Sequence, residues 1–299
     1  MQVSFKQTMT RQNAVALVAD STCDLSAMLI EQHQIGIVPL YILWGTESYR
    51  DGFEMDAPTF YARLDSSEQN KHPAPIKTSQ PAPEAFADVY QQAHDTQQAE
   101  AVVCMTLSQK LSGTWNSAQK ATRLVDFPVH VVDSTSVSFG LTVLSAARAR
   151  DRGASAEEIA QVARTVGQQS QIFVVLNTLD YLFRGGRISG TQRMVGSMLS
   201  IKPLLSIHDG EVAIADRVRT HKRAMARLVE LARCIDDKPG TLRLAVMDGG
   251  VRAEGDEVAA ELQAALHPSE LLRGTLSPVL GVHGGPGVIG FIAVPTALG

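Results

Sequence analysis

Hydroxyl side chains gather in four short stretches of this sequence, and they are the groups best suited to hold a charged ligand. The stretches are "DSTCD" (20–24), "KTSQP" (77–81), "TLSQKLSGT" (106–114) and "DSTS" (133–136). Serine and threonine hydroxyls at a helix entrance either cap the helix or join free backbone N–H groups in binding a carboxylate or phosphate. The anion-binding candidates are therefore Thr78, Ser79, Ser112 and the backbone of Gly113.

Helix capping is the ordinary structural explanation for the same hydroxyls. Ser112 or Thr114 suits the cap of a helix that begins near residue 114, and for this stretch taken alone capping is the favoured interpretation. Ser79 suits the start of a helix near residue 84, whose entry angle the two nearby prolines would fix. The alternative is that the hydroxyls form a clamp for an anion, and the residues alone leave this open.

A histidine and two aspartates raise the question of metal binding. His283 stands in the glycine-rich stretch "VHGGPGVIG" (282–290), where it can donate to an anion, move a proton or serve the structure alone. It has no HxxH spacing and no carboxylate pair nearby, so no metal site is predicted there. Turns stabilised by side chains explain Asp20 and Asp24 better than metal ligation does.

Cationic residues cluster in two later segments. Arg184 and Arg187 flank a glycine pair in "YLFRGGRISG" (181–190), and Arg219 belongs to the basic run "DRVRTHKRA" (216–224). These segments are either a solvated basic face or a docking surface for an acidic or phosphorylated partner. The sequence has no P-loop, nucleophile elbow, zinc-protease or kinase signature, so no catalytic residue and no cofactor are predicted.

Size and composition limit the kinds of protein that this chain can be. Its 299 residues suit two moderate domains, and its net charge of −4 argues against a nucleic-acid-binding surface. The 3 cysteines are far apart, which favours a reducing cytoplasm over a disulfide framework. We find no secretory signal and no apolar run near the ~20 residues that cross a bilayer.

The elements that must position these residues alternate along the first half. Apolar runs at the segments 14–20, 35–42, 101–107 and 129–134 predict strands, and the helical pattern recurs at 84–94, 114–124 and 136–150. This alternation predicts a three-layer α/β/α domain with a mainly parallel sheet. Three of the hydroxyl-rich stretches then follow strands, at the carboxyl ends where ligands bind in such sheets.

The second half predicts an α/β domain with a mixed sheet. Ser155 and Glu158 form a capping box at the start of a helix over 153–169, and Asp209–Gly210 predicts a hairpin turn within 202–220. Further strands are predicted at 172–179, 241–247 and 287–294. We therefore divide the chain into a flexible extension (1–12), an N-terminal domain (13–165) and a C-terminal domain (166–299).

Taken together in order, these motifs resemble the DegV family. The resemblance rests on "VADSTCDL", "YRDG", "KTSQPAPEAF", "LSGTWNSA", "VVDSTSVSFG", "LNTLDYLFRGGRIS", "IKPLLSIHDGEV", "RVRTHKRA" and "HGGPG", and it runs from about residue 13 to the C-terminus. The characterised bacterial members are fatty-acid-binding proteins of the FakB type. The resemblance implies a two-domain α/β fold that buries a long acyl chain. The apolar segments 172–182 and 194–205 are candidate walls for that chain or ordinary core.

The resemblance also implies a role for particular residues. It assigns the fatty-acid carboxylate to Thr78, Ser112 and His283, with Ser79 and the Gly113 backbone close by. Capping by Ser79 and ligand binding by Thr78 are then compatible. Trp115, where the family commonly has tyrosine, and Gly284, where a larger residue is frequent, are departures that could reshape the pocket.

The expected partner is a separate ATP-dependent fatty acid kinase subunit that converts the bound acid to acyl phosphate. Arg187 and Arg219 correspond to the family's docking or phosphoryl-handling positions. A lipid-binding carrier in the cytoplasm, without enzymatic activity of its own and with transient contact to a membrane surface, is the resulting prediction. The alternatives are a subunit related to dihydroxyacetone-type kinases and a regulatory lipid-sensing protein.

Overall fold

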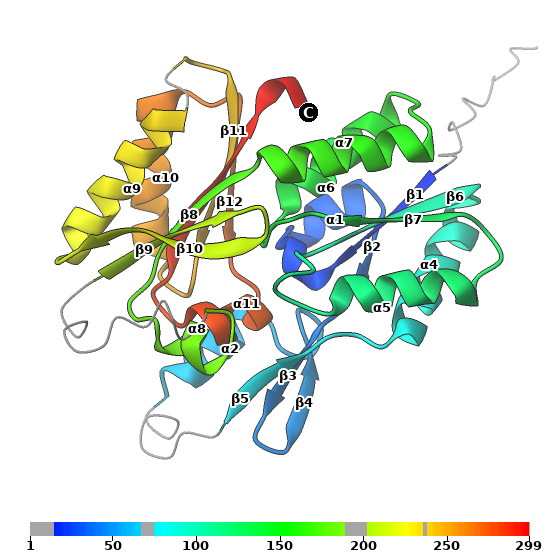
Figure 1. The fold of residues 1–299 in the computed structure, drawn as a ribbon, viewed down its shortest axis with the longest axis horizontal. Coiled ribbons are helices and arrows are strands. Elements are labelled where there is room, and N and C mark those ends of the chain that lie inside the picture. Colours follow the sequence, from blue (N-terminus) through cyan, green and yellow to red (C-terminus); the bar gives the residue numbers. More distant parts are fainter. Residues whose placement is uncertain (1–14, 67–74, 189–201, 236–237, 299) are drawn as a thin grey trace, which may run out of the picture.

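A four-stranded parallel sheet forms the centre of the first half of the molecule (Figure 1). The computed structural model describes residues 15–66, 75–188, 202–235 and 238–298, so the predicted extension over residues 1–12 lies outside it. The strand order is β2-β1-β6-β7, from β1 (Val15–Asp20), β2 (Ile35–Val38), β6 (Ala101–Thr106) and β7 (Val129–Asp133). The parallel pairing confirms the predicted sheet.

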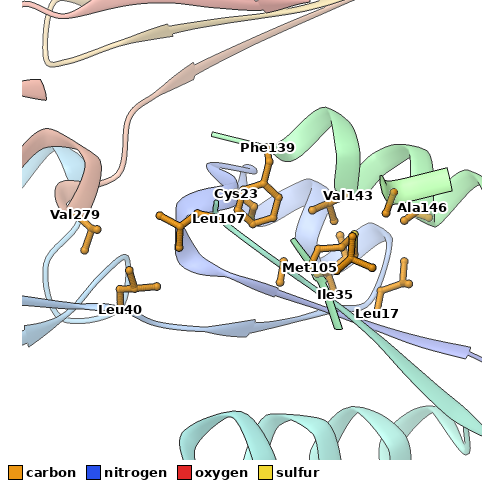
Figure 2. Close-up of a cluster of buried hydrophobic side chains, with 14 of the residues drawn as sticks. Leu17, Cys23, Ile35, Leu40, Met105, Leu107, Phe139, Val143, Ala146 and Val279 are labelled. Atoms are coloured by element: carbon orange, nitrogen blue, oxygen red, sulfur yellow. The ribbon is translucent and has the colours of Figure 1, made fainter. Parts of the chain in front are cut away.

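Helices cover both faces of this sheet because its strands are apolar on both sides. Ala16 and Val18 of β1 face α4 (Pro83–Gln97) and α5 (Thr114–Ala121). Leu17, between them, faces α6 (Gly140–Asp151) and α7 (Ala156–Gln169). Figure 2 shows this second cluster, in which Leu17, Met105 and Val143 meet. The capping box of Ser155 and Glu158 is present at the start of α7.

A small antiparallel sheet, absent from the sequence prediction, lies beside the parallel one. It consists of β3 (Tyr41–Trp44), β4 (Glu47–Arg50) and β5 (Ile76–Ser79) in the order β4-β3-β5. The predicted single strand over 35–42 is wrong, since β2 ends before Pro39 and β3 begins after it. Proline has no N–H to donate to a ladder, so the chain changes sheet there. Helices α1 (Ala27–Gln32) and α2 (Ala57–Leu64) complete this region.

The second half contains a six-stranded mixed sheet in the order β10-β9-β8-β13-β11-β12. Its strands are β8 (Gln171–Val175), β9 (Lys202–His208), β10 (Glu211–Val218), β11 (Leu242–Asp248), β12 (Glu270–Thr275) and β13 (Ile289–Pro295). Asp209 and Gly210 have φ angles of 50° and 75° and form the predicted hairpin turn between β9 and β10. The chain is thus a mixed α/β fold with one parallel and one separate mixed sheet, as predicted.

The two faces of the mixed sheet have different neighbours. One face packs against α9 (His221–Ile235) and α10 (Arg252–Leu266). The opposite face turns toward α6 and α7, where Leu141 and Val166 contact Ile172, Ile207 and Ile292. Two short helices, α8 (Asp180–Arg184) and α11 (Pro278–Gly284), lie at one end of the interface (Figure 1). The boundary that we propose near residue 165 lies within α7.

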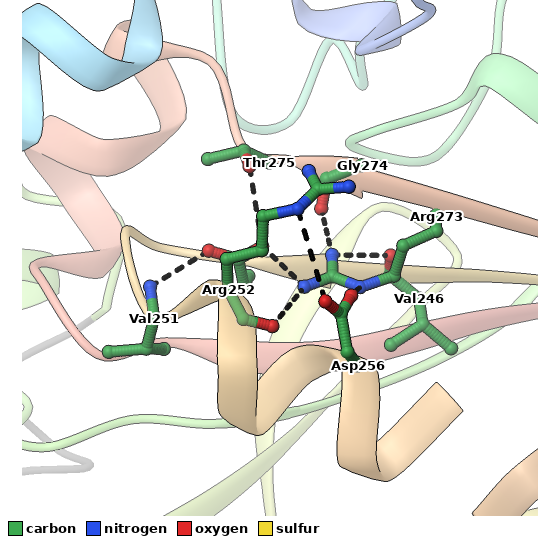
Figure 3. Close-up of polar contacts among 8 residues, drawn as sticks. Val246, Val251, Arg252, Asp256, Arg273, Gly274 and Thr275 are labelled. Carbon is green, nitrogen blue, oxygen red and sulfur yellow. Dashed lines mark hydrogen bonds and ion pairs between the residues drawn. The ribbon is translucent and has the colours of Figure 1, made fainter. Parts of the chain in front are cut away.

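Two arginines, Arg243 buried and Arg273 partly buried, hold the second half together, and Arg243 also joins it to the first. The Arg243 guanidinium donates to Ser145 Oγ of α6 at 2.6 Å and to Glu270 Oε2 at 2.7 Å. At the far end of β11, Arg273 donates to Asp248 Oδ2 at 2.7 Å and to Asp256 Oδ1 at 2.8 Å (Figure 3). These charge-assisted hydrogen bonds fix β11, β12 and α10 relative to one another.

Candidate functional site: a cavity between the two sheets

A cavity lies between the inward face of the mixed sheet and the strand-end loops of the first half. Its empty space totals about 950 Å³, counting the part that is open to solvent. Five of its lining side chains are polar, namely Thr78, Ser112, Ser138, Arg187 and His283. The remaining lining residues are apolar or glycine, so the cavity suits a ligand that is mostly hydrocarbon.

The apolar walls follow from the alternation of side chains along the strands. Ile172 and Val174 of β8, with Leu205 and Ile207 of β9, point from the mixed sheet into the cavity. Gly290 of β13 pairs with Val174 on one side and Met247 on the other. A side chain does not fit at this position, because its Cβ would stand 2.7 Å from the carbonyl oxygen of residue 173. The predicted wall over 172–182 therefore lines the cavity in part, whereas most of 194–205 lies outside the described residues.

The opposite wall comes from loops that the hydroxyl-rich stretches form at the carboxyl ends of β6 and β7. Asp20 Oδ2 accepts the N–H of Leu107 at 2.7 Å, and the Ser108 N–H donates to the Ser136 carbonyl at 2.9 Å. Asp20 Oδ1 also accepts from the Thr22 N–H and hydroxyl, which confirms the turn interpretation of this aspartate. The predicted rim of hydroxyl-rich loops is thus a packed structure, with Leu107 and Val137 facing the cavity.

Four of the polar lining residues meet at one end of the cavity, although they are far apart in sequence. Thr78 Oγ1 and His283 Nε2 lie 2.9 Å apart, joining β5 to α11. Arg187 Nε donates at 3.1 Å to the carbonyl of Leu111, the residue before Ser112, and its charge is close enough to His283 to lower the pKa of the imidazole. This arrangement offers an anion two hydroxyls, an imidazole and a guanidinium, and we call these four residues the polar end.

His283 is an uncharged group at this end. Burial and the neighbouring Arg187 lower its pKa to about 4, so the imidazole is neutral at physiological pH. Its Nδ1 is buried and forms no hydrogen bond within the described residues. Gly185 packs directly against it, since a Cβ on Gly185 would stand 2.2 Å from Nδ1.

Arg187 is the cation at the polar end. Its Nη1 donates to the Gly185 carbonyl at 2.6 Å, and desolvation lowers the pKa of its guanidinium, which stays protonated. The sequence prediction gave this arginine a docking or phosphoryl-handling role, and the structure places its side chain on the cavity wall. Arg219, its predicted companion, is exposed just after β10 and does not line the cavity.

Two of the other predicted ligand residues do not line the cavity. Ser79 follows Thr78 in β5, so its side chain points to the opposite face of the strand, and its Oγ donates to the Gln80 carbonyl at 3.3 Å. The predicted cap by Ser79 is wrong, because α4 begins at Pro83 with Ala82 as its N-cap. The chain forms a β-ladder with β3 at Thr78 and Ser79, and the helix starts only after it.

Gly113 and Ser112 have separate roles at the start of α5. Gly113 is the N-cap without a side-chain bond, and a Cβ there would stand 2.0 Å from Gln80 Oε1. Neither Ser112 nor Thr114 is the N-cap residue, but Ser112 Oγ accepts the N–H of Thr114, the first residue of α5, at 3.3 Å. Ser112 Oγ lies 2.8 Å from Thr114 Oγ1 and lines the cavity. Of the two departures from the family pattern, Gly284 lines the cavity and Trp115 does not.

Two buried carboxylates attach α11, the helix that carries His283, to the first half. The Ser277 N–H donates to Asp24 Oδ1 at 3.1 Å, and the Val279 N–H donates to Asp51 Oδ1 at 3.3 Å. Burial raises the pKa of Asp24 to about 8 and that of Asp51 to about 7. Because both groups face α11, its attachment depends on pH in the neutral range.

Replacing Asp24 with asparagine is expected to reduce the dependence of stability on pH. The native protein keeps the Asp24 proton up to pH about 8, whereas the unfolded chain releases it near pH 4, so raising the pH between these values favours unfolding. As the pH rises over that range, the free energy of unfolding of the variant should fall by up to about 1.4 kcal/mol less per pH unit than that of the parent protein. Urea unfolding from pH 5 to 8 measures the free energy of unfolding at each pH. Asp88→Asn, on the exposed side of α4, is the charge-matched control. If this free energy changes with pH equally in Asp24→Asn and the parent protein, the prediction is wrong.

Among the described residues, no helix is both long and apolar enough to cross a membrane. Nor do they contain a group of three or more histidine, cysteine, aspartate or glutamate side chains arranged to hold a metal ion. The three cysteines are free, with Cys23 and Cys104 buried and Cys234 exposed. The cavity is therefore the feature on which a functional interpretation depends.

Comparison with known proteins places the chain in a family. Residues 14–296 match the model of a family described as "Uncharacterised protein, DegV family". A fatty acid-binding protein of Thermotoga maritima is 35% identical over 288 residues, which cover 93% of this chain and 96% of the relative. A solved fatty-acid-binding DegV family protein from Thermus thermophilus has a TM-score of 0.84 at 31% identity, covering 94% of this chain and 99% of that one. A stearic acid-binding protein from Eubacterium ventriosum has a TM-score of 0.83 at 28% identity, covering 94% and 98%. The chain described here belongs to the DegV family.

Proposed function

We propose that this protein binds a long-chain fatty acid in the cavity between the mixed sheet and the strand-end loops, with the carboxylate at the polar end. The observation that carries the proposal is the placement of Thr78, Ser112, Arg187 and His283 together at one end of an otherwise largely apolar cavity. A fatty acid matches this separation of polar and apolar lining, because each buried methylene of its chain contributes roughly 0.8 kcal/mol to the free energy of binding. The apolar walls offer a small polar carbonyl compound no such match, which disfavours the dihydroxyacetone-type alternative.

Charge balance at the polar end supports a carboxylate rather than a phosphate. His283 is neutral, so Arg187 supplies the one positive charge among the four residues. A single carboxylate neutralises it, and the two hydroxyls supply further hydrogen bonds. A phosphate with nearly two negative charges would leave a net charge buried.

The second part of the proposal concerns the fate of the bound acid. We infer that a separate ATP-dependent kinase transfers the γ-phosphate to the carboxylate, which yields an acyl phosphate and ADP. The carrier supplies the acid and the partner supplies the nucleotide site, because this chain carries no nucleotide-binding motif. Arg219 stands exposed on the surface and is the residue that we assign to partner docking.

Lipid extraction tests the binding function directly. The protein purified under native conditions is expected to release a long-chain fatty acid on denaturation, identified by mass spectrometry, and the delipidated protein should take up one equivalent of stearic acid. A protein that carries no acid and takes up none would overturn the proposal. Formation of acyl phosphate after adding an ATP-dependent fatty acid kinase tests the second part, and Arg219→Glu should reduce it without changing stearic acid affinity.

Gly185 offers a test of how the polar end is positioned. Gly185→Ala is expected to weaken stearic acid binding about 10-fold, because the new Cβ would stand 2.2 Å from His283 Nδ1 and push the imidazole away from Thr78. The backbone of Gly185, with φ of −74°, accepts alanine without strain. Gly186→Asn is the matched control, since residue 186 has open space around it and a φ of 70° that asparagine tolerates. Equal affinities for the two variants would mean that the position of His283 does not matter for binding.

A further inference from the structure

A second, smaller cavity adjoins the one described above, which we call the main cavity. The empty space of the second cavity is about 380 Å³, counting the part that is open to solvent. Ser138 and Met247 line both cavities. Ser138 is short and its hydroxyl bonds to the carboxyl group of Asp24, so Met247 is the side chain long enough to fill the passage between the cavities.

Met247 stands between two glycines in a row of residues that crosses the mixed sheet. From β9 to β12, the strand register pairs in turn Leu205, Val174, Gly290, Met247 and Gly274. Directly paired residues of neighbouring strands present their side chains on the same face of a sheet. Gly290 lines the main cavity and Gly274 lines the second, so Met247 is the side chain of this row that separates them.

The end of the Met247 side chain lies over Gly274. A Cβ on Gly274 would stand 2.7 Å from Met247 Cε and 3.0 Å from its Sδ. Methionine is unbranched and has three rotatable bonds, so its end adapts to the space on either side. In its present position the side chain closes the main cavity toward the second one.

Met247 lies away from the polar end, as the packing of the apolar lining shows. One packing cluster of the main cavity contains Leu176, Leu182, Leu205 and Val288. This cluster adjoins the polar end, because the Arg187 N–H donates to the Leu182 carbonyl at 3.0 Å. Another cluster packs against α6 and α7 and contains Ile172, Ile207, Met247 and Ile292. An acyl chain whose carboxylate lies at the polar end therefore extends from the first cluster toward the cluster of Met247.

The second cavity suits the end of a hydrocarbon chain. Its apolar lining consists of Cys23, Leu25, Leu29, Ala245, Leu272 and Met247. Burial raises the pKa of Asp24 to about 8, so this carboxyl group is uncharged at neutral pH, and it accepts the Ser277 N–H at 3.1 Å. The Arg273 guanidinium donates to Asp248 and Asp256. The ionisable groups thus have partners within the protein, and methylenes gain from burial beside the apolar ones.

We propose that Met247 sets the longest acyl chain that the protein accepts, by closing the main cavity toward the second. This inference rests on the proposed fatty-acid-binding function and names the residue that determines its chain-length limit. With a shorter side chain at residue 247 the two cavities join, and the end of a longer acid enters the second cavity.

Competition between stearic acid and docosanoic acid, which has four more carbons, tests this role. The delipidated full-length protein is incubated with an equimolar mixture, and the bound acids are extracted and quantified by mass spectrometry. The parent protein should bind at least about 10-fold less docosanoic than stearic acid, because the extra methylenes find no apolar wall. Met247→Ala should raise the ratio of bound docosanoic to stearic acid by at least about 10-fold. Met247→Val also shortens the side chain and replaces the alanine variant if that variant does not fold.

Gly274→Ala should shift the limit in the opposite direction. Its Cβ would displace the end of Met247 toward Gly290, and its backbone accepts alanine because its φ lies outside the left-handed region. In competition with myristic acid, which has four fewer carbons, the bound share of stearic acid should fall about 5-fold. Met225→Ala is the matched control, since Met225 packs with α9 on the other face of the mixed sheet, and it should keep both parent ratios.

The proposed role of Met247 is overturned if the parent protein binds docosanoic and stearic acid equally. It is also overturned if folded Met247→Ala or Met247→Val keeps the parent ratio of these acids, or if Gly274→Ala keeps the parent ratio of stearic to myristic acid. A parent protein that binds none of the three acids would instead overturn the proposed function, so the two failures are distinguishable.

Discussion

Arg187→Met is expected to weaken stearic acid binding by at least about 100-fold, the largest effect among single substitutions in the cavity. Removing one partner of a buried charge pair costs roughly 2–5 kcal/mol, much of it from leaving the other charge unpaired. Arg187 is the cation at the polar end, and its guanidinium is held by the carbonyls of Leu111 and Gly185 rather than by an acidic side chain of the described residues. Displacement of a fluorescent fatty acid measures the loss.

Arg184 supplies the control for this prediction. It belongs to the same motif, but its side chain is exposed and its guanidinium lies 5.0 Å from the centre of the Tyr181 ring. Arg184→Met should therefore leave the affinity within twofold. Octadecanol, which has no carboxylate, should bind Arg187→Met and the parent protein alike. A variant at Arg187 with the parent affinity for stearic acid would show that the carboxylate lies elsewhere.

The double substitution Thr78→Val and His283→Ala is the second large effect, with an expected loss of about 100-fold in stearic acid affinity. Each single substitution should cost about 10-fold, the value of a hydrogen bond to a buried charge. The two side chains lie 2.9 Å apart, and a double-mutant cycle by calorimetry measures how far the double loss departs from the additive value of about 100-fold.

Ser79→Ala is the matched control in the same strand, because the Ser79 side chain lies on the opposite face of β5 from Thr78. Its affinity should equal that of the parent protein. A thermal unfolding curve for each variant separates loss of binding from loss of folding. If the double variant folds normally and still binds stearic acid within twofold, Thr78 and His283 do not contact the carboxylate.

Local patterns predicted those features that depend on neighbouring residues alone. The capping box at Ser155 and the hairpin at Asp209–Gly210 are present because each is complete within a few positions. The parallel sheet was also predictable, since alternating apolar runs and helical patterns permit few arrangements. By contrast, the strand β5 was interpreted as a helix cap, because its partner β3 lies more than thirty residues earlier.

The candidate site shows the same division between local and distant information. Thr78 and His283 are separated by 205 positions, and no spacing rule connects them, so their pairing came from the family resemblance. The cavity-facing direction of Arg187 depends on the carbonyl of Leu111 in a different loop. Ser138 belongs to a recognised motif, but nothing in its sequence context shows that its side chain would line the cavity.

The walls of the cavity belong to both halves of the molecule, and this has a consequence for how a ligand is released. An acyl chain bound as proposed would make apolar contacts with both the mixed sheet and the strand-end loops, so it would form part of the interface between the two halves. Any motion that separates the two halves would expose the acyl chain to water. The ligand would also stabilise the folded protein, adding about 2.7 kcal/mol to the free energy of unfolding at 100 times its dissociation constant. Release of the proposed ligand would then require the interface to open, and a partner that binds only the open form would draw the acid out without competing for the polar end.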